Sequence, residues 1–265
     1  MTYAGRTVSP VTATGLVLEH MWTWYRRNWR ATIVSSVLTP VMFLGAMGFG
    51  LGSQIKPGPV TENLPYVVYL APAVLVGLAV QIAATESSFP VLGSFKWDQR
   101  YYAITATPIS VDQLLIGQVV WIALRVFASG LAYVAVAALL GAFVNVGALV
   151  AVPVSMLAGM ALGTWVVALA ATVSDEGNTF GNMFRFVVVP MTLFAGTYYP
   201  ISQLPAWSRP LAWVTPLWHG NELARAAEFG HMDLLTAAGH VAYLLVLTAG
   251  GLLLARWRFH VRLEV

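Results

Sequence analysis

A chain of 265 residues that is 58% hydrophobic and only 9% charged is too apolar for a soluble domain, because soluble domains carry about 25% charged residues. The absence of cysteine excludes disulfides, cysteine nucleophiles and thiolate metal sites. The composition therefore predicts an integral membrane protein. Its net charge of +3 is better explained by membrane topology than by binding to nucleic acid.

Residues 1–30 are too polar for a signal peptide, which needs an apolar core soon after its basic start. One helical face nevertheless gathers apolar and aromatic residues at i, i+4, i+7 and i+11: Leu18, Trp22, Tyr25 and Trp29. Arg26 and Arg27 lie mostly elsewhere on the helix. The pattern predicts an amphipathic helix over 12–30 in the cytoplasmic interface of the membrane, and a cytoplasmic extension of the first span is the alternative.

Six apolar stretches are predicted to cross the membrane, since a straight span needs about 20 residues. They cover residues 31–52, 64–85, 113–142, 147–173, 183–199 and 234–254. Together with the segments between them, they predict a single all-α integral membrane domain over residues 1–265.

The distribution of basic residues predicts the orientation of these spans. Six spans put both termini on one side of the membrane. If that side is the cytoplasm, ten Lys and Arg residues face inward and only Lys56, Arg209 and Arg225 face outward. The positive-inside rule therefore predicts that both termini are cytoplasmic.

The longest polar interruption between the early spans is the loop 86–112. It is predicted to contain a short helix with an apolar face made by Val91, Phe95 and Tyr102. Lys96 and Arg100 form a basic pair at i, i+4, and Trp97 lies between them. These residues favour a docking surface over the alternative of a solvated connector.

The third predicted span begins with a capping-box sequence, Ser110 followed by Gln113, and carries Arg125 near its middle. An arginine facing lipid at that depth costs at least a few kcal/mol, so Arg125 is expected to face the bundle or a cavity. Contact with a substrate and a structural ion pair are both open interpretations. Glu222 is a candidate partner, whereas Glu86 lies roughly 20 Å away by helix rise and is predicted to be a poor one.

The stretch 190–230 is apolar at first and is then interrupted by Pro200, Pro205, Pro210 and Pro216. No piece between Tyr199 and Thr215 is long enough to span a membrane. Broken backbone at membrane depth must be buried against protein or water. We therefore predict a span that ends early, then a plug over 200–232 with a re-entrant or interfacial helix from Pro216. The alternative, an ordinary surface loop, is disfavoured by its many apolar residues: Leu204, Trp207, Leu211, Trp213, Leu217 and Trp218.

Motifs for catalysis are missing from the sequence. It contains neither G-x-x-x-x-G-K-[ST] nor H-E-x-x-H, and its five histidines lack metal-ligand spacing. Ser129 faintly resembles the nucleophile of intramembrane serine proteases, but Phe127 stands where a glycine is expected. An enzyme is therefore not predicted. A secondary transporter or channel remains an alternative, although no internal repeat is found.

Several stretches match one family in order and spacing: Leu38-Thr-Pro-Val-Met-Phe, Ala84-Thr-Glu-Ser-Ser-Phe, Ile104 to Asp112, Gly117 to Arg125, and Pro190 to Arg225. Nearly the whole chain resembles the permease subunit of type 2 ABC exporters, the ABC-2 permease family. It is most similar to the branch that contains nodulation-signal and daunorubicin-type drug exporters. Polysaccharide-exporting relatives are a competing branch, but nothing in this chain resembles a dedicated carbohydrate site.

The resemblance implies a subunit of the bacterial plasma membrane that pairs with separate P-loop ATPase subunits and with a second permease. That second permease would be an identical copy or a paralogue. ATP and Mg would bind to the ATPase, and this chain is expected to hold no cofactor. The implied activity is export of a hydrophobic or amphipathic cargo, such as a drug, an antibiotic or a lipid-like molecule, in the manner of multidrug export.

The resemblance also implies roles for individual residues. The residues expected to contact the ATPase or to couple to it are Arg26, Arg27, Glu86, Phe95, Lys96, Trp97 and Arg100. The residues expected to line the substrate pathway or its external gate are Arg125, Tyr198, Tyr199, Pro216, His219 and Glu222.

Overall fold

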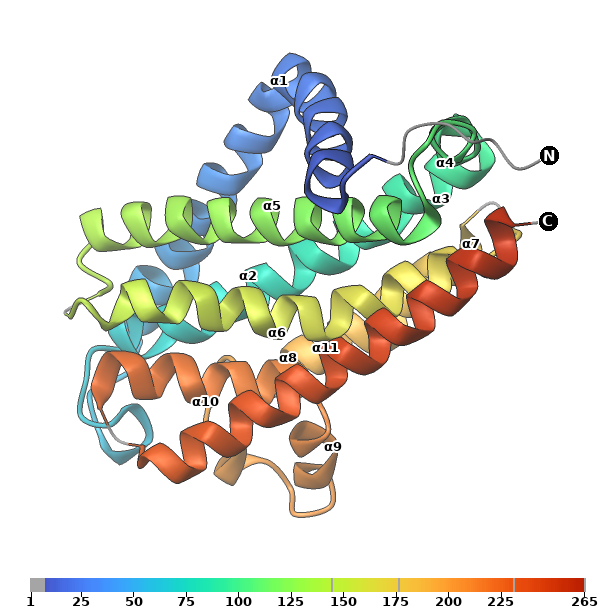
Figure 1. Ribbon diagram of the computed structural model, residues 1–265. Coiled ribbons are helices and arrows are strands. Elements are labelled where there is room, and N and C mark those ends of the chain that lie inside the picture. The colour runs from blue at the N-terminus through green and yellow to red at the C-terminus, as the bar shows by residue number, and fades with distance from the viewer. Residues whose placement is uncertain (1–7, 144, 176, 231, 265) are drawn as a thin grey trace.

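The computed structural model describes residues 8–143, 145–175, 177–230 and 232–264, and this part of the chain is helical without strands. Four segments of it are long and apolar enough to cross a membrane: Tyr66–Lys96, Val111–Leu139, Gly147–Ala170 and Leu234–Leu263. They contain the helices α2 (Tyr66–Ser87), α5 (Val111–Leu139), α6 (Gly147–Ala170) and α11 (Leu234–Leu263). Figure 1 shows these four helices running alongside one another.

The other helices are shorter or interrupted. They are α1 (Pro10–Phe43), α3 (Phe89–Lys96), α4 (Arg100–Thr105), α7 (Asn178–Met183), α8 (Val189–Phe194), α9 (Arg209–Trp213) and α10 (Pro216–Phe229). π-helical turns continue α1 over Leu44–Gly50 and join α7 to α8 over Phe184–Val188. Single 3-10 turns cover Leu51–Gln54, Pro59–Thr61 and Ile201–Gln203.

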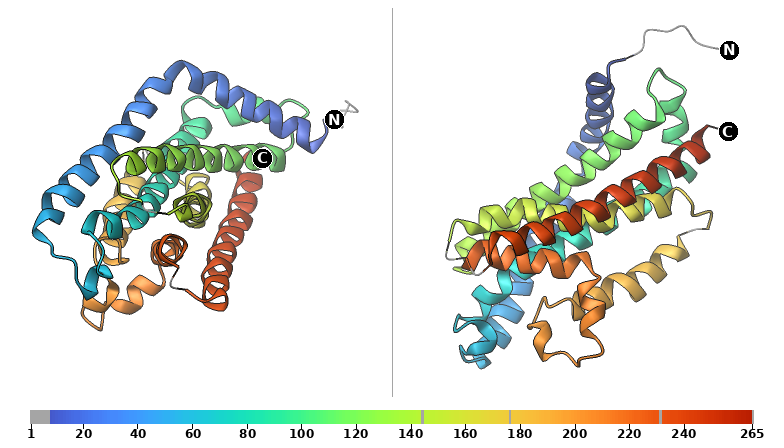
Figure 2. Two further views of the ribbon diagram at one scale, coloured as in Figure 1. Left: turned by 90° about the vertical axis from the view of Figure 1, so that its left-hand side faces the viewer. Right: turned by 60° about the horizontal axis from the view of Figure 1, so that its bottom comes forward.

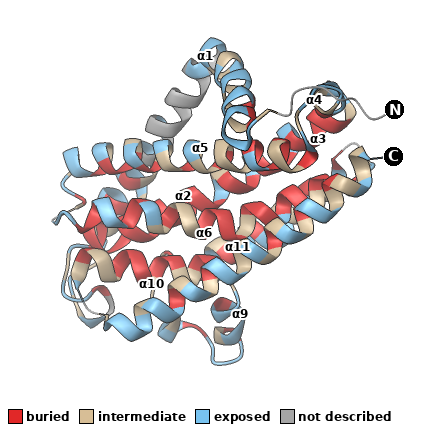
Figure 3. Cartoon of the chain, in the orientation of Figure 1, coloured by how far each residue is buried: buried red, intermediate tan, exposed pale blue. Residues whose placement is uncertain are grey.

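Helix α6 is the centre of the bundle, because α2, α5, α10 and α11 all pack against it. Small residues permit the close approach: a methyl group on Gly159 would lie 2.8 Å from the carbonyl oxygen of Ala79 on α2. Figure 3 shows that α2 and α6 are mostly buried, whereas α11 is largely exposed on its outer side. The most apolar window of the α2 segment is 83% buried and that of α11 only 17%, so α2 belongs to the core and α11 to its edge.

Four of the six predicted spans therefore correspond to helices of membrane-spanning length. The fifth, over 183–199, falls on the shorter run from Asn178 to Phe194, which the π-helical turn interrupts. The first, over 31–52, falls on the second half of α1 and the turns after it. Most side chains of residues 30–40 lie outside the described part of the structure, so this span stays a prediction.

The amphipathic segment predicted over 12–30 is not a separate helix, because α1 continues through it into the first predicted span. This continuity matches the alternative of an extended span. Figure 2 shows that α1 bends and that its first arm lies over α5. Val17 is buried there, and a methyl group on Gly117 would lie only 2.6 Å from its Cγ1.

Two ends of the molecule can be distinguished in Figure 1. We call the end that carries the start of α1, the helices α3 and α4, and the end of α11 the terminal end. We call the opposite end the plug end; it carries the turn between α5 and α6, the loop before α2 and the end of α10.

Candidate functional site

Arg125 forms an ion pair with Glu86 at the terminal end. Its Nη2 donates to Oε1 of Glu86 at 2.6 Å, and both side chains are mostly buried, with exposed fractions of 13% and 21%. The guanidinium carbon also lies 4.3 Å from the ring centroid of Tyr25 on α1. The prediction that Glu86 is a poor partner was wrong, and so was the choice of Glu222, which lines a cavity at the plug end.

The helices α2 and α5 are displaced relative to each other along their axes, which explains the error. The predicted distance of roughly 20 Å between Glu86 and Arg125 assumed that α2 ends and α5 begins at the same depth. At 1.5 Å per residue α5 is about 43 Å long, well beyond the roughly 30 Å of a hydrocarbon core, and its first turns extend past the end of α2. Arg125 therefore lies level with Glu86 in the last turn of α2.

A cavity of about 610 Å³ opens between α1, α3 and α5, and we call it the terminal cavity. Its large apolar lining residues are Met21, Trp24, Phe89, Trp97 and Trp121. Its polar lining residues are Glu86, Ser94, Asp98, Arg100, Gln118 and Arg125. Three predicted coupling residues and one predicted pathway residue thus meet at a single site.

The remaining predicted coupling residues lie elsewhere at the terminal end. Phe95 is buried, and its ring lies 4.7 Å from that of Tyr101 and 4.9 Å from that of Phe259 on α11. The Nζ of Lys96 donates to the carbonyl oxygen of Ser174 at 3.0 Å, in the turn after α6. Arg26 and Arg27 are exposed on α1. The loop is therefore folded and anchored, and Phe95 is a core residue.

The turn that receives Lys96 is itself ordered by Asp175. The carboxylate accepts hydrogen bonds from the Thr179 hydroxyl and the Gly177 backbone N–H, both at 2.7 Å. These bonds stabilise the ionised form, so the pKa of Asp175 lies below its ordinary value. The turn thus presents fixed carbonyl oxygens to the end of α3.

The end of α11 contributes residues that the sequence analysis used only to infer orientation. Nη1 of Arg262 donates to the carbonyl oxygens of Ala170 and Ala171, and its guanidinium carbon lies 4.3 Å from the ring centroid of Phe95. Arg256 binds the carboxylate of Asp112 through two hydrogen bonds of 2.9 Å. A basic residue such as Arg262 in the last turn of a helix suits its dipole, but the partners of Arg262 and Arg256 were not predictable from the sequence.

The plug begins where the helix α8 breaks at Gly196, whose φ of +77° favours glycine. Two buried side chains of α10 bond to the freed carbonyl oxygens there. Nδ2 of Asn221 donates to Ala195 O at 3.0 Å, and Nη2 of Arg225 donates to Gly196 O at 2.8 Å. The broken backbone is thus satisfied within the protein, as membrane depth requires. Neither role was predicted from the sequence, although a polar pair at i, i+4 after a helix break is a usable signal.

Helix α10 begins at Pro216 and turns back into the bundle. The hydroxyl of Thr215 caps it by accepting from the N–H of Trp218 at 3.3 Å. A methyl group on Gly220 would lie 2.7 Å from the Cβ of Ala158, near the middle of α6. The start of α10 therefore lies at mid-bundle, and Pro216 itself is buried.

His219 links α10 to α11. Its Nδ1 lies 2.8 Å from Nδ1 of His240, and its Nε2 lies 2.9 Å from the carbonyl oxygen of Trp213. Its ring stacks on Tyr243 at 3.9 Å. The predicted pathway residue His219 is thus placed in a contact between the plug and the last helix.

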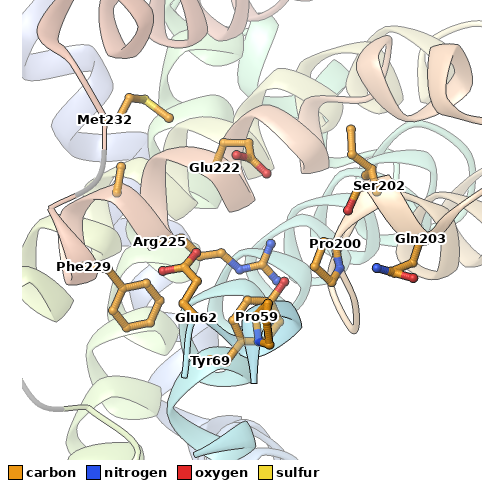
Figure 4. A pocket seen from close by; sticks show the side chains of 12 residues that line it. Pro59, Glu62, Tyr69, Pro200, Ser202, Gln203, Glu222, Arg225, Phe229 and Met232 are labelled. Carbon is orange, nitrogen blue, oxygen red and sulfur yellow. The ribbon is translucent and has the colours of Figure 1, made fainter. Parts of the chain in front are cut away.

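Two neighbouring cavities open at the plug end. The larger, of about 560 Å³, is lined by Glu62, Tyr69, Glu222 and Arg225, among others, and Figure 4 shows these side chains around it. The guanidinium carbon of Arg225 lies 4.3 Å from the ring centroid of Tyr69. The second, of about 440 Å³, is lined by Lys56 and four tyrosines: Tyr66, Tyr69, Tyr198 and Tyr199. Of the predicted pathway residues, Arg125 thus lies at the terminal end, Tyr198, Tyr199 and Glu222 line the cavities at the plug end, and Pro216 and His219 lie at the start of α10.

A helical bundle with long apolar helices and a broken, internally bonded segment before the last helix defines a multi-pass membrane protein. The model of the ABC-2 type transporter family matches residues 12–229, so the chain belongs to this family. This confirms the resemblance drawn from the sequence. Members of the family are the membrane subunits of ABC transporters and work with ATP-binding subunits.

Curated relatives cover most of the chain. Nodulation protein J of Sinorhizobium fredii is 29% identical over 217 residues, which is 78% of this chain and 81% of that protein. Nodulation protein J of Rhizobium leguminosarum bv. viciae is 28% identical over 233 residues, 84% of this chain and 86% of that protein. The protein of the same name from Rhizobium meliloti is 25% identical over 219 residues, 79% of this chain and 82% of that protein.

Proposed function

We propose that this chain is the permease subunit of an ATP-driven exporter in the bacterial plasma membrane, with both termini in the cytoplasm. It would move a hydrophobic or amphipathic cargo, such as a drug, an antibiotic or a lipid-like molecule, out of the cell. A separate P-loop ATPase would bind ATP and Mg and hydrolyse ATP. The observation that carries this proposal is the folded loop between α2 and α5, which contacts α5, the turn after α6 and α11 at the terminal end.

That loop has the properties of a surface that transmits force. Trp97 and Tyr102 are exposed on it and available to a partner, whereas Phe95 and Tyr101 are buried beneath them. A push on the exposed side would reach α2 and α5 through Glu86 and α11 through the buried aromatic rings. A flexible connector would absorb the same push by local rearrangement.

The plug end supplies the proposed exit. Helix α11 spans about 45 Å at 1.5 Å per residue, which is long enough to join the terminal end to the contact between His219 and His240. Tilting of α11 would therefore move α10 and open the cavities beside it. The tyrosine-lined cavity supports an amphipathic cargo, because tyrosine offers both an apolar ring and a polar hydroxyl. A second permease copy, identical or paralogous, would complete the pathway.

Purification of the chain from its native membrane in mild detergent tests the proposal. Mass spectrometry is expected to find a stoichiometric P-loop ATPase, and the complex is expected to hydrolyse ATP. Replacing Trp97 and Arg100 by alanine is expected to release the ATPase. The matched control is Trp207→Ala, which removes an exposed tryptophan from the plug segment. A chain that purifies alone at every detergent strength would instead support a secondary transporter or channel.

A further inference from the structure

The terminal cavity has the dimensions of a site for a small molecule. Its volume of about 610 Å³ falls within the roughly 300–1,000 Å³ typical of ligand pockets. Its walls come from four parts of the chain: the first arm of α1, the last turn of α2, the α3–α4 segment and the middle of α5. Such pockets have mainly apolar and aromatic walls with a few convergent polar groups, and this cavity has both.

The charges that line the cavity compensate one another. Arg125 pairs with Glu86 at 2.6 Å, and Arg100 pairs with Asp98 at 2.9 Å. An occupant with a net positive or negative charge would have to compete with one of these pairs. The charge distribution therefore favours an uncharged ligand.

The lining also offers hydrogen-bond donors. Gln118 lines the cavity and is 95% buried, and its Oε1 accepts from the Tyr101 hydroxyl at 2.8 Å. The Nε of Arg100, another lining residue, is buried without a hydrogen-bond partner among the described residues. Buried donors are normally bonded, so Arg100 favours an occupant with an acceptor oxygen. Because Oε1 of Gln118 is already engaged, this residue has its amide N–H groups to offer to the same occupant.

We infer that the terminal cavity binds an uncharged amphiphile whose polar end carries hydroxyl, carbonyl or ether oxygens. The acceptor oxygens would bond to Gln118 and Arg100, and the apolar body would pack between Trp24, Trp97 and Trp121. Binding itself does not depend on the proposed function. The consequence of binding does depend on the proposed function, because an occupant would separate the first arm of α1 from the α3–α4 segment, and coupling with the ATPase is assigned to both.

Trp97 and Gly93 control the shape of the cavity wall. The aromatic ring of Trp97 lies directly over Gly93, where a methyl group would come within 3.0 Å of Cε3. Gly93→Ala is therefore expected to push this ring away from its position. The variant changes the cavity without removing a polar group or a charge.

The test measures binding to the purified full-length chain in lipid nanodiscs. Three dansyl probes differ only in their polar end: triethylene glycol, sulfonate or trimethylammonium. Energy transfer from tryptophan reports binding. The uncharged probe is expected to bind about tenfold more tightly than either charged probe, a difference that titration resolves readily. Gly93→Ala is expected to weaken it by a similar factor, whereas Trp207→Ala at the plug end is expected to leave it unchanged.

Gln118→Glu gives a second, more specific test. The glutamate retains an acceptor for the Tyr101 hydroxyl but replaces the amide donor group with negative charge. The preference is expected to shift from the uncharged probe to the trimethylammonium probe, which a purely structural role would not produce. Two outcomes would overturn the inference: tightest binding of a charged probe by the unaltered chain, or indifference of probe binding to all cavity variants.

The assay also separates failure of this inference from failure of the proposed function. A chain that purifies without an ATPase but binds the uncharged probe would refute the exporter proposal alone. A complex that hydrolyses ATP but shows no probe binding at the cavity would refute the inference alone.

Discussion

The two ends of the molecule hold polar groups inside an apolar bundle by different means. At the terminal end, the most buried ion pair joins two charged side chains, Arg125 and Glu86, whereas Lys96 and Arg262, which bond to carbonyl oxygens at and after the end of α6, are only partly buried. At the plug end, buried side chains bond to the backbone, as Arg225 does to Gly196 and Glu228 to the N–H of Asn145. The first arrangement joins regular helices to one another, whereas the second replaces backbone hydrogen bonds that a broken helix has lost.

This difference predicts that substitutions at the two ends have different effects. A side-chain pair between intact helices can be rearranged while both helices persist, which suits an end that a partner moves. Backbone groups freed by a helix break have no second partner in an apolar surrounding. Substitutions at the plug end are therefore expected to reduce stability, and those at the terminal end to affect coupling more than folding.

The largest effect is expected for Arg225→Met. Loss of the guanidinium leaves the carbonyl oxygens of Gly196 and Thr197 without this donor, at a cost of about 3 kcal/mol in the free energy of unfolding. Thermal unfolding in detergent measures it. The control is Arg209→Met, because Arg209 also donates to carbonyl oxygens, those of Ser202 and Leu204, but is only partly buried. Equal losses from both variants would show that burial of the bonded carbonyl groups does not determine the cost.

Glu86→Gln is expected to lower the stability of the protein less than Arg225→Met does, but to lower its transport activity more. The neutral amide can still accept a hydrogen bond from Arg125, but that bond is weaker than the bond to a carboxylate. The loss of the charge is expected to lower the free energy of unfolding by about 2 kcal/mol. Cargo transport is expected to fall while ATP hydrolysis by the complex persists. The double variant with Arg125→Met is expected to be more stable than the sum of the single changes predicts. Strict additivity would show that the pair contributes nothing.

Gly117→Ala tests whether the contact between α1 and α5 takes part in coupling. The added methyl group meets Val17 at 2.6 Å and must displace the first arm of α1, which is expected to cost about 1 kcal/mol. Gly15→Ala is the control on the same arm, since nothing lies within 4 Å of its added methyl group. Gly117→Ala is expected to reduce the ATPase response to cargo, and an unchanged response would exclude the arm from coupling.

The smallest effect is expected for Asp175→Asn, in the turn that receives Lys96. Because the pKa of Asp175 is lowered in the folded state, its carboxylate stabilises the protein above the ordinary carboxyl pKa. That contribution is lost as the pH falls through the lowered value. The unfolding temperature of the variant is expected to be slightly lower at neutral pH and to match that of the unaltered chain once the pH lies below the lowered pKa of Asp175. A difference that persists in acid would point to a cause other than ionisation.

Local features of the chain were predictable because they depend on few neighbouring residues. Composition indicated a membrane protein, and the prolines marked the break before α10. The capping box at Ser110 forms as predicted: its Oγ accepts from the N–H of Gln113 at 3.2 Å, and Oε1 of Gln113 accepts in return at 2.9 Å. The capping signal lies within one turn of the chain, and composition needs no knowledge of which segments meet.

The pairing of side chains between helices was decided by the tertiary structure alone. Whether Arg125 meets Glu86 or Glu222 depends on how far α5 is displaced along its axis relative to α2. That displacement is the sum of many small packing contacts, such as Val17 on Gly117, and no short sequence pattern encodes it. The sequence thus determined which segments are helical and where they break, and the packing of those helices decided which charges and rings meet.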